Sequence, residues 1–206
     1  LRNKVRRTKY TQNACGTNVE RVRFDVLDGL RGVAAFAVLV MHVTPYNAIL
    51  ITPHAALAVN LSAAFHTIRL ALPMMRTKSW GRIINVSSIY GLRGAADRVG
   101  YVTTKTALIG LTRAVALETA GQNITCNAVC PGTSRTPIHQ STLQGLLDGD
   151  DLSLPDAERT LLAGKQPTGR LVAPENVAAL MLFLCGPESA DITGATFPVD
   201  GGWSAA

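Results

Sequence analysis

The sequence contains little cysteine, and its cysteines show no metal-binding pattern. Four cysteines occur in 206 residues, without a Cys-x-x-Cys pair and without a histidine at zinc-finger spacing. This excludes a zinc finger and predicts free thiols in a reducing, cytoplasmic setting. Cys126, Cys130 and Cys185 lie in or beside predicted regular elements, so we expect them to be buried as small hydrophobic side chains. No metal site is expected.

A hydrophobic run of membrane-spanning length is also missing. The uninterrupted apolar run within residues 32–43 is about half of the roughly 20 residues that a membrane helix needs. Extending this run to residue 51 would enclose His42, Pro45 and Asn47. We therefore expect no membrane partner.

Acidic residues are scarce at the start of the chain. The formal net charge is +6, but residues 1–32 hold eight Lys and Arg against three Asp and Glu, and the remainder is nearly neutral. Such a basic tail could bind nucleic acid or anionic lipid, but neither interleaved aromatic residues nor zinc-ligand spacing accompanies it. We interpret it as a solvated tail and expect no nucleic-acid partner.

The length of the chain favours one α/β domain rather than two. Residues 1–23 follow neither a helical nor a strand period, so we expect residues 1–45 to form a basic, partly disordered segment with one apolar run. Residues 46–206 are expected to form the domain. Because the first residue is Leu1 rather than methionine, we expect a truncated or processed beginning.

Apolar spacing predicts an alternation of helices and strands in the domain. Helices are expected at 53–75, 101–119 and 174–184, and strands at 82–86, 124–129 and 196–199. Residues 133–166 are expected to form a long connection with a solvated acidic turn at residues 148–151. Strands that alternate with helices indicate a parallel sheet covered on both faces.

One cluster of residues predicts chemistry. Tyr101-x-x-x-Lys105 places a phenol and an ammonium on one face of a helix, and Ser88 precedes Tyr101 by thirteen residues at the end of a predicted strand. A cation beside the phenol favours the phenolate, so the pKa of Tyr101 should fall toward the working range of a general acid or base. The cluster indicates proton transfer in a carbonyl or alcohol oxidoreductase.

From about Leu57 onward the chain resembles the short-chain dehydrogenase/reductase family, and within it the D-3-hydroxybutyrate dehydrogenases. The motifs that carry the resemblance are Asn60-Leu-Ser-Ala-Ala-Phe-His-Thr-Ile-Arg69, Trp80-Gly-Arg-Ile-Ile-Asn85, Tyr101-x-x-x-Lys105, Asn127-Ala-Val-Cys-Pro-Gly132, Lys165-Gln-Pro167 and Val199-Asp-Gly-Gly-Trp203. The resemblance implies the C-terminal part of a truncated, Rossmann-like, doubly wound parallel sheet. It also implies pairing of helices 53–75 and 101–119 across a twofold axis, and hence a homo-oligomer.

The resemblance implies a role for each matching residue. Tyr101 would be the catalytic acid and base, Lys105 its partner that also binds the nicotinamide ribose, and Ser88 the hydroxyl that polarises the carbonyl. Asn60 would hold a relay water near the lysine. Pro131, Gly132 and Thr136 would line the nicotinamide. Trp203, Arg98 and Tyr90 would contact the substrate. Tyr90 stands where the hydroxybutyrate dehydrogenases have a histidine.

The implied reaction is the NAD-linked interconversion of a small 3-hydroxy acid and its 3-oxo acid. NADP is not excluded, and a 3-oxoacyl reductase or a non-catalytic, oligomer-forming remnant are the alternatives. The glycine-rich turn, the acidic ribose-binding residue and the Asn-Asn-Ala-Gly stretch of the family are absent from this sequence. We therefore expect weak cofactor binding and impaired activity.

The apolar run near the start of the chain admits two interpretations. Asp28-Gly-Leu-Arg-Gly32 leads into an apolar run that ends at His42. Through this motif, residues 24–43 resemble the opening of the acyltransferase-3 family, which would make them a fusion remnant, a membrane-tethered acyl-transfer fragment or a chance match. Residues 36–43 also stand where the preceding strand of a short-chain dehydrogenase would lie, and we expect them to replace it, with a helix as the rival.

Overall fold

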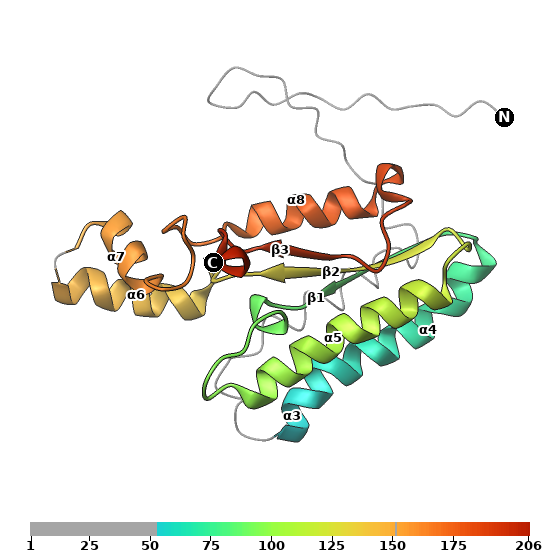
Figure 1. Cartoon of the computed structure of the whole chain (residues 1–206), viewed down its shortest axis with the longest axis horizontal. Coiled ribbons are helices and arrows are strands. Elements are labelled where there is room, and N and C mark those ends of the chain that lie inside the picture. The colour runs from blue at the N-terminus through green and yellow to red at the C-terminus, as the bar shows by residue number, and fades with distance from the viewer. Residues whose placement is uncertain (1–52, 151) are drawn as a thin grey trace, which may run out of the picture. The chain divides into compact units, whose positions relative to one another are not determined.

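The computed structural model describes residues 53–150 and 152–206. Within them, the three predicted strands form one parallel sheet in the order β1-β2-β3 (Figure 1). The strands are β1 (Gly81–Val86), β2 (Ile124–Pro131) and β3 (Thr196–Val199). Ile83 aligns with Cys126 in the first pair, and Cys130 aligns with Pro198 in the second. The predictions for residues 1–45, including the strand at 36–43 and Cys15, lie outside the described residues.

Helices cover both faces of this sheet (Figure 1). Helices α4 (Ala63–Thr77) and α5 (Val99–Glu118) lie on one face, and α8 (Pro174–Cys185) lies on the other. The central strand β2 is therefore buried along its length except at its last residue, as expected of a parallel strand between two layers. The doubly covered parallel sheet predicted from the sequence is confirmed.

The main hydrophobic core lies between the sheet and the α4–α5 layer. Residues of four elements share it: Ile68, Ile83, Val115, Ala116, Ile124 and Cys126. Helix α5 also buries Leu108 and Ile109, so it has apolar residues on two faces. Cys126 and Cys130 are free and fully buried, but the expected burial of Cys185 is wrong. Leu184 takes the buried position in the last turn of α8 and leaves Cys185 on the exposed side.

The predicted helix at 53–75 is present but irregular. It runs as α3 (Pro53–Leu57), a π turn η1 (Ala58–Ser62) and α4. Residues Ala55–Thr77 are long and apolar enough to cross a membrane by length and composition alone. A helix that packs on a sheet of a globular domain meets the same criterion, and here the helix contacts α5 and β1.

The expectation of a long connection at residues 133–166 is wrong. This segment forms α6 (Pro137–Asp150) and α7 (Leu154–Leu161), so Asp148 belongs to the last turn of a helix rather than to a separate acidic turn. The two helices share a second, smaller core of Leu143, Ala157, Leu162 and Leu171. Leu143, Leu146 and Leu147 of α6 pack at this core and are spaced by three and four residues, so the sequence does carry a helical pattern that the expected connection left out of account.

Candidate active site

The candidate site lies at the carboxyl ends of the parallel strands. Ser88 follows β1, Pro131 ends β2, and Trp203 follows β3 within the 3-10 turn η4 (Trp203–Ala205). Strands that run in one direction end at one edge of the sheet, and ligands of such sheets bind there. The Ser88 hydroxyl also caps the 3-10 turn η2 (Ile89–Gly91) by accepting a hydrogen bond from the Tyr90 amide at 3.2 Å.

Helix α5 brings Tyr101 and Lys105 to this edge beside Ser88. The Tyr101 hydroxyl and the Ser88 hydroxyl are hydrogen-bonded through their side chains. Lys105 Nζ donates to the Val86 carbonyl oxygen at 3.0 Å and lies 5.7 Å from the centroid of the Tyr101 ring. The structure therefore brings together the three residues that the sequence predicts for proton transfer.

Their electrostatics differ from the sequence-based expectation. Burial raises the pKa of Tyr101 above its ordinary value, although the Ser88 hydrogen bond and the Arg98 charge act in the lowering direction. Burial lowers the pKa of Lys105 to about 8. The expected lowering of the tyrosine pKa by the lysine is therefore wrong for this structure. The ammonium faces the ring and the Val86 carbonyl, and desolvation of the phenol outweighs the charges around it.

Asn60 lies on the π turn η1, which packs against α5. Its side chain is only 2% exposed, and its Nδ2 has no hydrogen-bond partner. A buried amide without a partner costs about 1–3 kcal/mol, and π turns within helices often occur at functional sites. Burial and an unpaired donor give Asn60 the properties of a residue that binds a polar group at the site.

Aromatic rings line the side of the site near Tyr101. The Tyr90 ring packs edge-on against Tyr101 at 6.2 Å and against Trp203 at 5.4 Å between centroids. The Arg98 guanidinium lies 5.7 Å above the Tyr90 ring. The three residues predicted to meet the substrate, Tyr90, Arg98 and Trp203, therefore form one cluster beside the tyrosine.

The segment after β2 is held close to two other loops. Gly132 donates its amide hydrogen to the Val199 carbonyl at 3.0 Å, and a Cβ atom there would lie 2.6 Å from Gln166 Oε1 and 2.9 Å from Asp200 Cα. Thr136 Oγ1 lies 3.1 Å from His139 Nδ1, at the start of α6. Glycine is thus needed at position 132 for close packing against Gln166 and Asp200, and Thr136 lies directly before α6.

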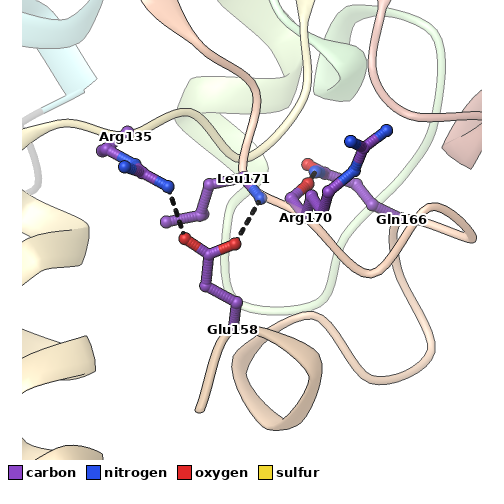
Figure 2. Close-up of polar contacts among 5 residues, drawn as sticks. All are labelled: Arg135, Glu158, Gln166, Arg170 and Leu171. Carbon is purple, nitrogen blue, oxygen red and sulfur yellow. Dashed lines mark hydrogen bonds and ion pairs between the residues drawn. The ribbon is translucent and has the colours of Figure 1, made fainter. Parts of the chain in front are cut away.

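A buried carboxylate fixes this segment from the side of α7. Figure 2 shows Glu158 accepting hydrogen bonds from the Arg135 guanidinium at 2.7 Å and from the Leu171 amide at 3.5 Å. Gln166 accepts from the Thr133 amide and donates to the Arg170 carbonyl at 2.7 Å. The position of the segment therefore depends on side chains from a part of the chain that is distant in sequence.

Sequence reasoning assigned no role to several of these side chains. Gln166 and Asp200 lie inside motifs that the sequence analysis quoted, so the signal was present without a function attached to it. Asp200 accepts hydrogen bonds from the amides of Gly202 and Ser204 at 3.0 and 2.7 Å. Glu158 gave no signal, because nothing in the sequence distinguishes a buried glutamate from those of a solvated helix.

A parallel α/β sheet with a serine, a tyrosine and a lysine at its carboxyl edge defines a class of oxidoreductase folds. A family model described as enoyl-(acyl carrier protein) reductase matches residues 5–204 of this chain. The chain belongs to the short-chain dehydrogenase/reductase family.

No group of three His, Cys, Asp or Glu residues that could hold a metal ion occurs within residues 53–150 and 152–206.

Two proteins that share one name are similar to most of this chain. The chain is 43% identical to D-beta-hydroxybutyrate dehydrogenase of Cupriavidus necator over 151 residues, which cover 73% of this chain and 58% of that protein. It is 40% identical to the Rhizobium meliloti protein of the same name over 149 residues, or 72% of this chain and 58% of that protein. The chain thus spans less than two thirds of the length of these relatives.

Solved structures agree on the fold. ElxO with NADP bound is similar with a TM-score of 0.64 and 32% identity, over 73% of this chain and 57% of that chain. A variant of actinorhodin polyketide ketoreductase with NADPH gives the same TM-score and identity, over 75% of this chain and 61% of the other. The Rossmann-like fold predicted from the sequence is thereby confirmed.

Proposed function

We propose that this protein interconverts a small 3-hydroxy acid, such as 3-hydroxybutyrate, and its 3-oxo acid by hydride transfer to or from NAD(P). The observation that carries the proposal is the cluster of Tyr101 with the buried Ser88 and Lys105 at the carboxyl ends of the strands. Identity of 40–43% to two D-beta-hydroxybutyrate dehydrogenases supports the substrate class. NAD is the cofactor we propose, with NADP as the alternative.

Proton transfer is assigned to Tyr101. Because burial favours the neutral phenol of Tyr101, oxidation requires its deprotonation first. The substrate hydroxyl then gives its proton to the phenolate oxygen while its C–H bond breaks and the carbonyl forms. A nicotinamide held by these residues would take up the hydride in oxidation and would supply it in reduction. During reduction, Tyr101 returns the proton to the forming alkoxide, and the Ser88 hydroxyl holds the same substrate oxygen. Such acid–base help contributes about a hundredfold to ten-thousandfold in rate.

Arg98 and Trp203 are assigned to the substrate carboxylate. A guanidinium can meet a carboxylate with two parallel hydrogen bonds, and Arg98 already lies beside the rings that flank Tyr101. Tyr90 stands between these two residues and would supply an apolar wall. This arrangement favours a short acid whose charged end lies near the reacting carbon.

The described residues suit the nicotinamide riboside half of the cofactor. The Lys105 ammonium has three N–H donors, and the Val86 carbonyl takes one of them, which leaves donors for ribose hydroxyls. The unpaired Asn60 amide supplies a further donor for a relay water. Pro131, Gly132 and Thr136 would line the nicotinamide itself. The sequence has no glycine-rich turn for the diphosphate, so we propose weak cofactor binding.

The rest of the proposal concerns the setting of this site. We assign residues 46–206 to the C-terminal part of a short-chain dehydrogenase/reductase domain and residues 1–45 to a separate basic segment. The partners are a small-molecule acid and further copies of this chain, without nucleic acid or membrane. The cytoplasm is the proposed location.

The test is NADH formation from D-3-hydroxybutyrate at millimolar NAD. We expect turnover that Tyr101→Phe abolishes, with half-saturation by NAD in the millimolar range. Half-saturation at micromolar NAD would show that the diphosphate is well held. Absence of turnover at every NAD concentration would favour the non-catalytic, oligomer-forming remnant.

A second candidate is a 3-oxoacyl reductase that uses NADP. The NADP- and NADPH-bound structures among the structural neighbours favour it. Oxidation of NADPH with a 3-oxoacyl thioester, at a higher rate than oxidation of NADH with acetoacetate, would support this candidate over the first.

A further inference from the structure

Arg93 joins two parts of the chain that meet beside the site. Its Nη1 atom donates hydrogen bonds to the main-chain oxygens of Trp203 and Ala206, the latter at 2.9 Å. The arginine follows η2, and both acceptors belong to or follow η4. The contact therefore ties the segment after β1 to the turn after β3.

The side chain of Trp203 packs against Tyr90, whose ring in turn contacts the reacting tyrosine. Its ring is 8% exposed and packs edge-on against Tyr90, with an angle of 75° between the ring planes. Tyr90 in turn packs edge-on against Tyr101, at 78°. The rings of Trp203, Tyr90 and Tyr101 thus form a continuous row. Arg93 holds the outer end of this row through its hydrogen bond to the main-chain oxygen of Trp203.

The other contacts of the turn fix its shape and its far side. Asp200 accepts from the amides of Gly202 and Ser204, which closes the turn on itself. The Thr168 amide donates to the Gly201 carbonyl at 3.2 Å, which attaches the turn to the loop before α8. Neither contact reaches the segment that carries Tyr90, whereas the Arg93 contact does.

An arginine suits this position for a geometric reason. A guanidinium carries five N–H donors in a rigid plane, so one group can serve two carbonyl acceptors in neighbouring positions. Lysine has a compact ammonium on a flexible stem and would hold the same two acceptors less firmly. Methionine would keep an unbranched stem and lose both hydrogen bonds.

We propose that Arg93 is a positioning residue that sets how closely Trp203 packs against Tyr90, and Tyr90 against Tyr101, and thereby limits the length of the acid that the site accepts. This rests on the proposed function, because Trp203 and Tyr90 face the substrate only if the acid binds beside Tyr101. Arg93 itself touches neither substrate nor cofactor. Its removal should loosen the aromatic row without altering the proton-transfer residues.

The first test follows Trp203 directly and requires no ligand. Trp80→Phe leaves Trp203 as the single tryptophan of the chain, since the sequence has two. In this background Arg93→Met should shift the tryptophan emission to longer wavelength and increase its quenching by acrylamide, and Arg93→Lys should recover part of the change. Arg113→Met, on the exposed side of α5, is the matched control and should change neither. Unchanged emission in Arg93→Met would overturn the proposal.

The second test measures acid selectivity through the same fluorescence. D-3-hydroxybutyrate and D-3-hydroxyhexanoate are titrated into each variant at millimolar NAD. Arg93→Met removes the two hydrogen bonds that hold the turn of Trp203. We expect it to weaken binding of the shorter acid roughly fivefold to tenfold, and to bring the two dissociation constants closer together. If Arg93→Met displaces Trp203 but leaves the ratio of the two dissociation constants at its wild-type value, the proposed role of Arg93 in acid selectivity is overturned. If neither acid binds the wild type, the proposed function fails, while the emission data still decide whether Arg93 holds Trp203.

Discussion

Lys105 Nζ donates a hydrogen bond to the Val86 carbonyl oxygen at 3.0 Å, and this contact ties α5 to the end of β1. The acceptor is neutral, so it does not offset the cost of burying the ammonium, and the pKa of Lys105 falls to about 8. The lysine is thus held in place by a group that does little to keep it charged.

This depressed pKa predicts a pH-dependent stability. Between pH 8 and about 10.5 the unfolded chain binds more protons at this lysine than the folded chain does, so its contribution to the free energy of unfolding rises with pH. The raised pKa values of Tyr101 and of the buried thiols make the free energy of unfolding fall with pH in this range. The contribution of Lys105 must therefore be obtained by comparing the wild type with a variant that lacks this lysine. The free energy of unfolding of wild type minus that of Lys105→Met should rise by roughly 1–2 kcal/mol between pH 8 and 9.5. Urea titrations at each pH measure this difference in the free energy of unfolding. Lys78→Met, at the exposed end of α4, is the control. A difference that does not change with pH would contradict the prediction.

Replacement of Asn60 should increase the stability of the fold and decrease turnover. Its buried Nδ2 lacks a partner, so Asn60→Leu, of similar size, removes an unsatisfied group and should raise the free energy of unfolding by about 1 kcal/mol. Turnover, if the protein is active, should fall at the same time. Asn127→Leu is the control, because Asn127 donates to Ile192 and accepts from Ala195, and its loss should destabilise the fold. Equal destabilisation by both substitutions would refute this interpretation.

Gly132 is required by close packing. Gly132→Ala would place a Cβ atom 2.9 Å from Asp200 Cα, and the main chain of β3 and its following turn would have to move. We expect a loss of about 1–3 kcal/mol in the free energy of unfolding. Gly145→Ala in α6 meets no neighbouring atom and should instead stabilise by about 0.5–1 kcal/mol. Thermal unfolding of the two variants distinguishes local helix propensity from packing at the site.

A second copy of the chain is expected to cover α4. Apolar side chains on this helix are exposed, with Leu70 at 72% and Phe65 at 50%, and contiguous exposed apolar surface marks interaction sites. Leu70→Glu should convert an oligomer into a monomer at micromolar concentration, as measured by light scattering. Leu154→Glu, on the exposed side of α7, should leave the mass unchanged. A monomeric wild type would count against the homo-oligomer.

How much the sequence reveals depends on the packing of each element. Strand β2 and helix α5 contact neighbours on two sides, so their apolar patterns are long and both were predicted. Helices α6 and α7 also carry apolar residues at helical spacing, such as Leu143 and Leu147, but the acidic residues near their junction favoured a turn in the sequence-based prediction. The spacing of Tyr101 and Lys105 predicted their proximity correctly. It could not predict the direction of the ammonium or the depth of burial, and these decide the sign of the tyrosine pKa shift.

The π turn η1 has a consequence for the register of its helix. A π turn accommodates one residue more than the equivalent stretch of α-helix, whose residues are spaced by about 100° around the axis. The extra residue is absorbed between α3 and α4, so the segments on either side can each keep their own packing face while Asn60 turns inward between them. Deleting one residue of η1 would therefore rotate one segment by about a quarter turn against the other. The helix can act as a sheet-covering element and as the carrier of a buried polar group because these two tasks are separated at a single turn.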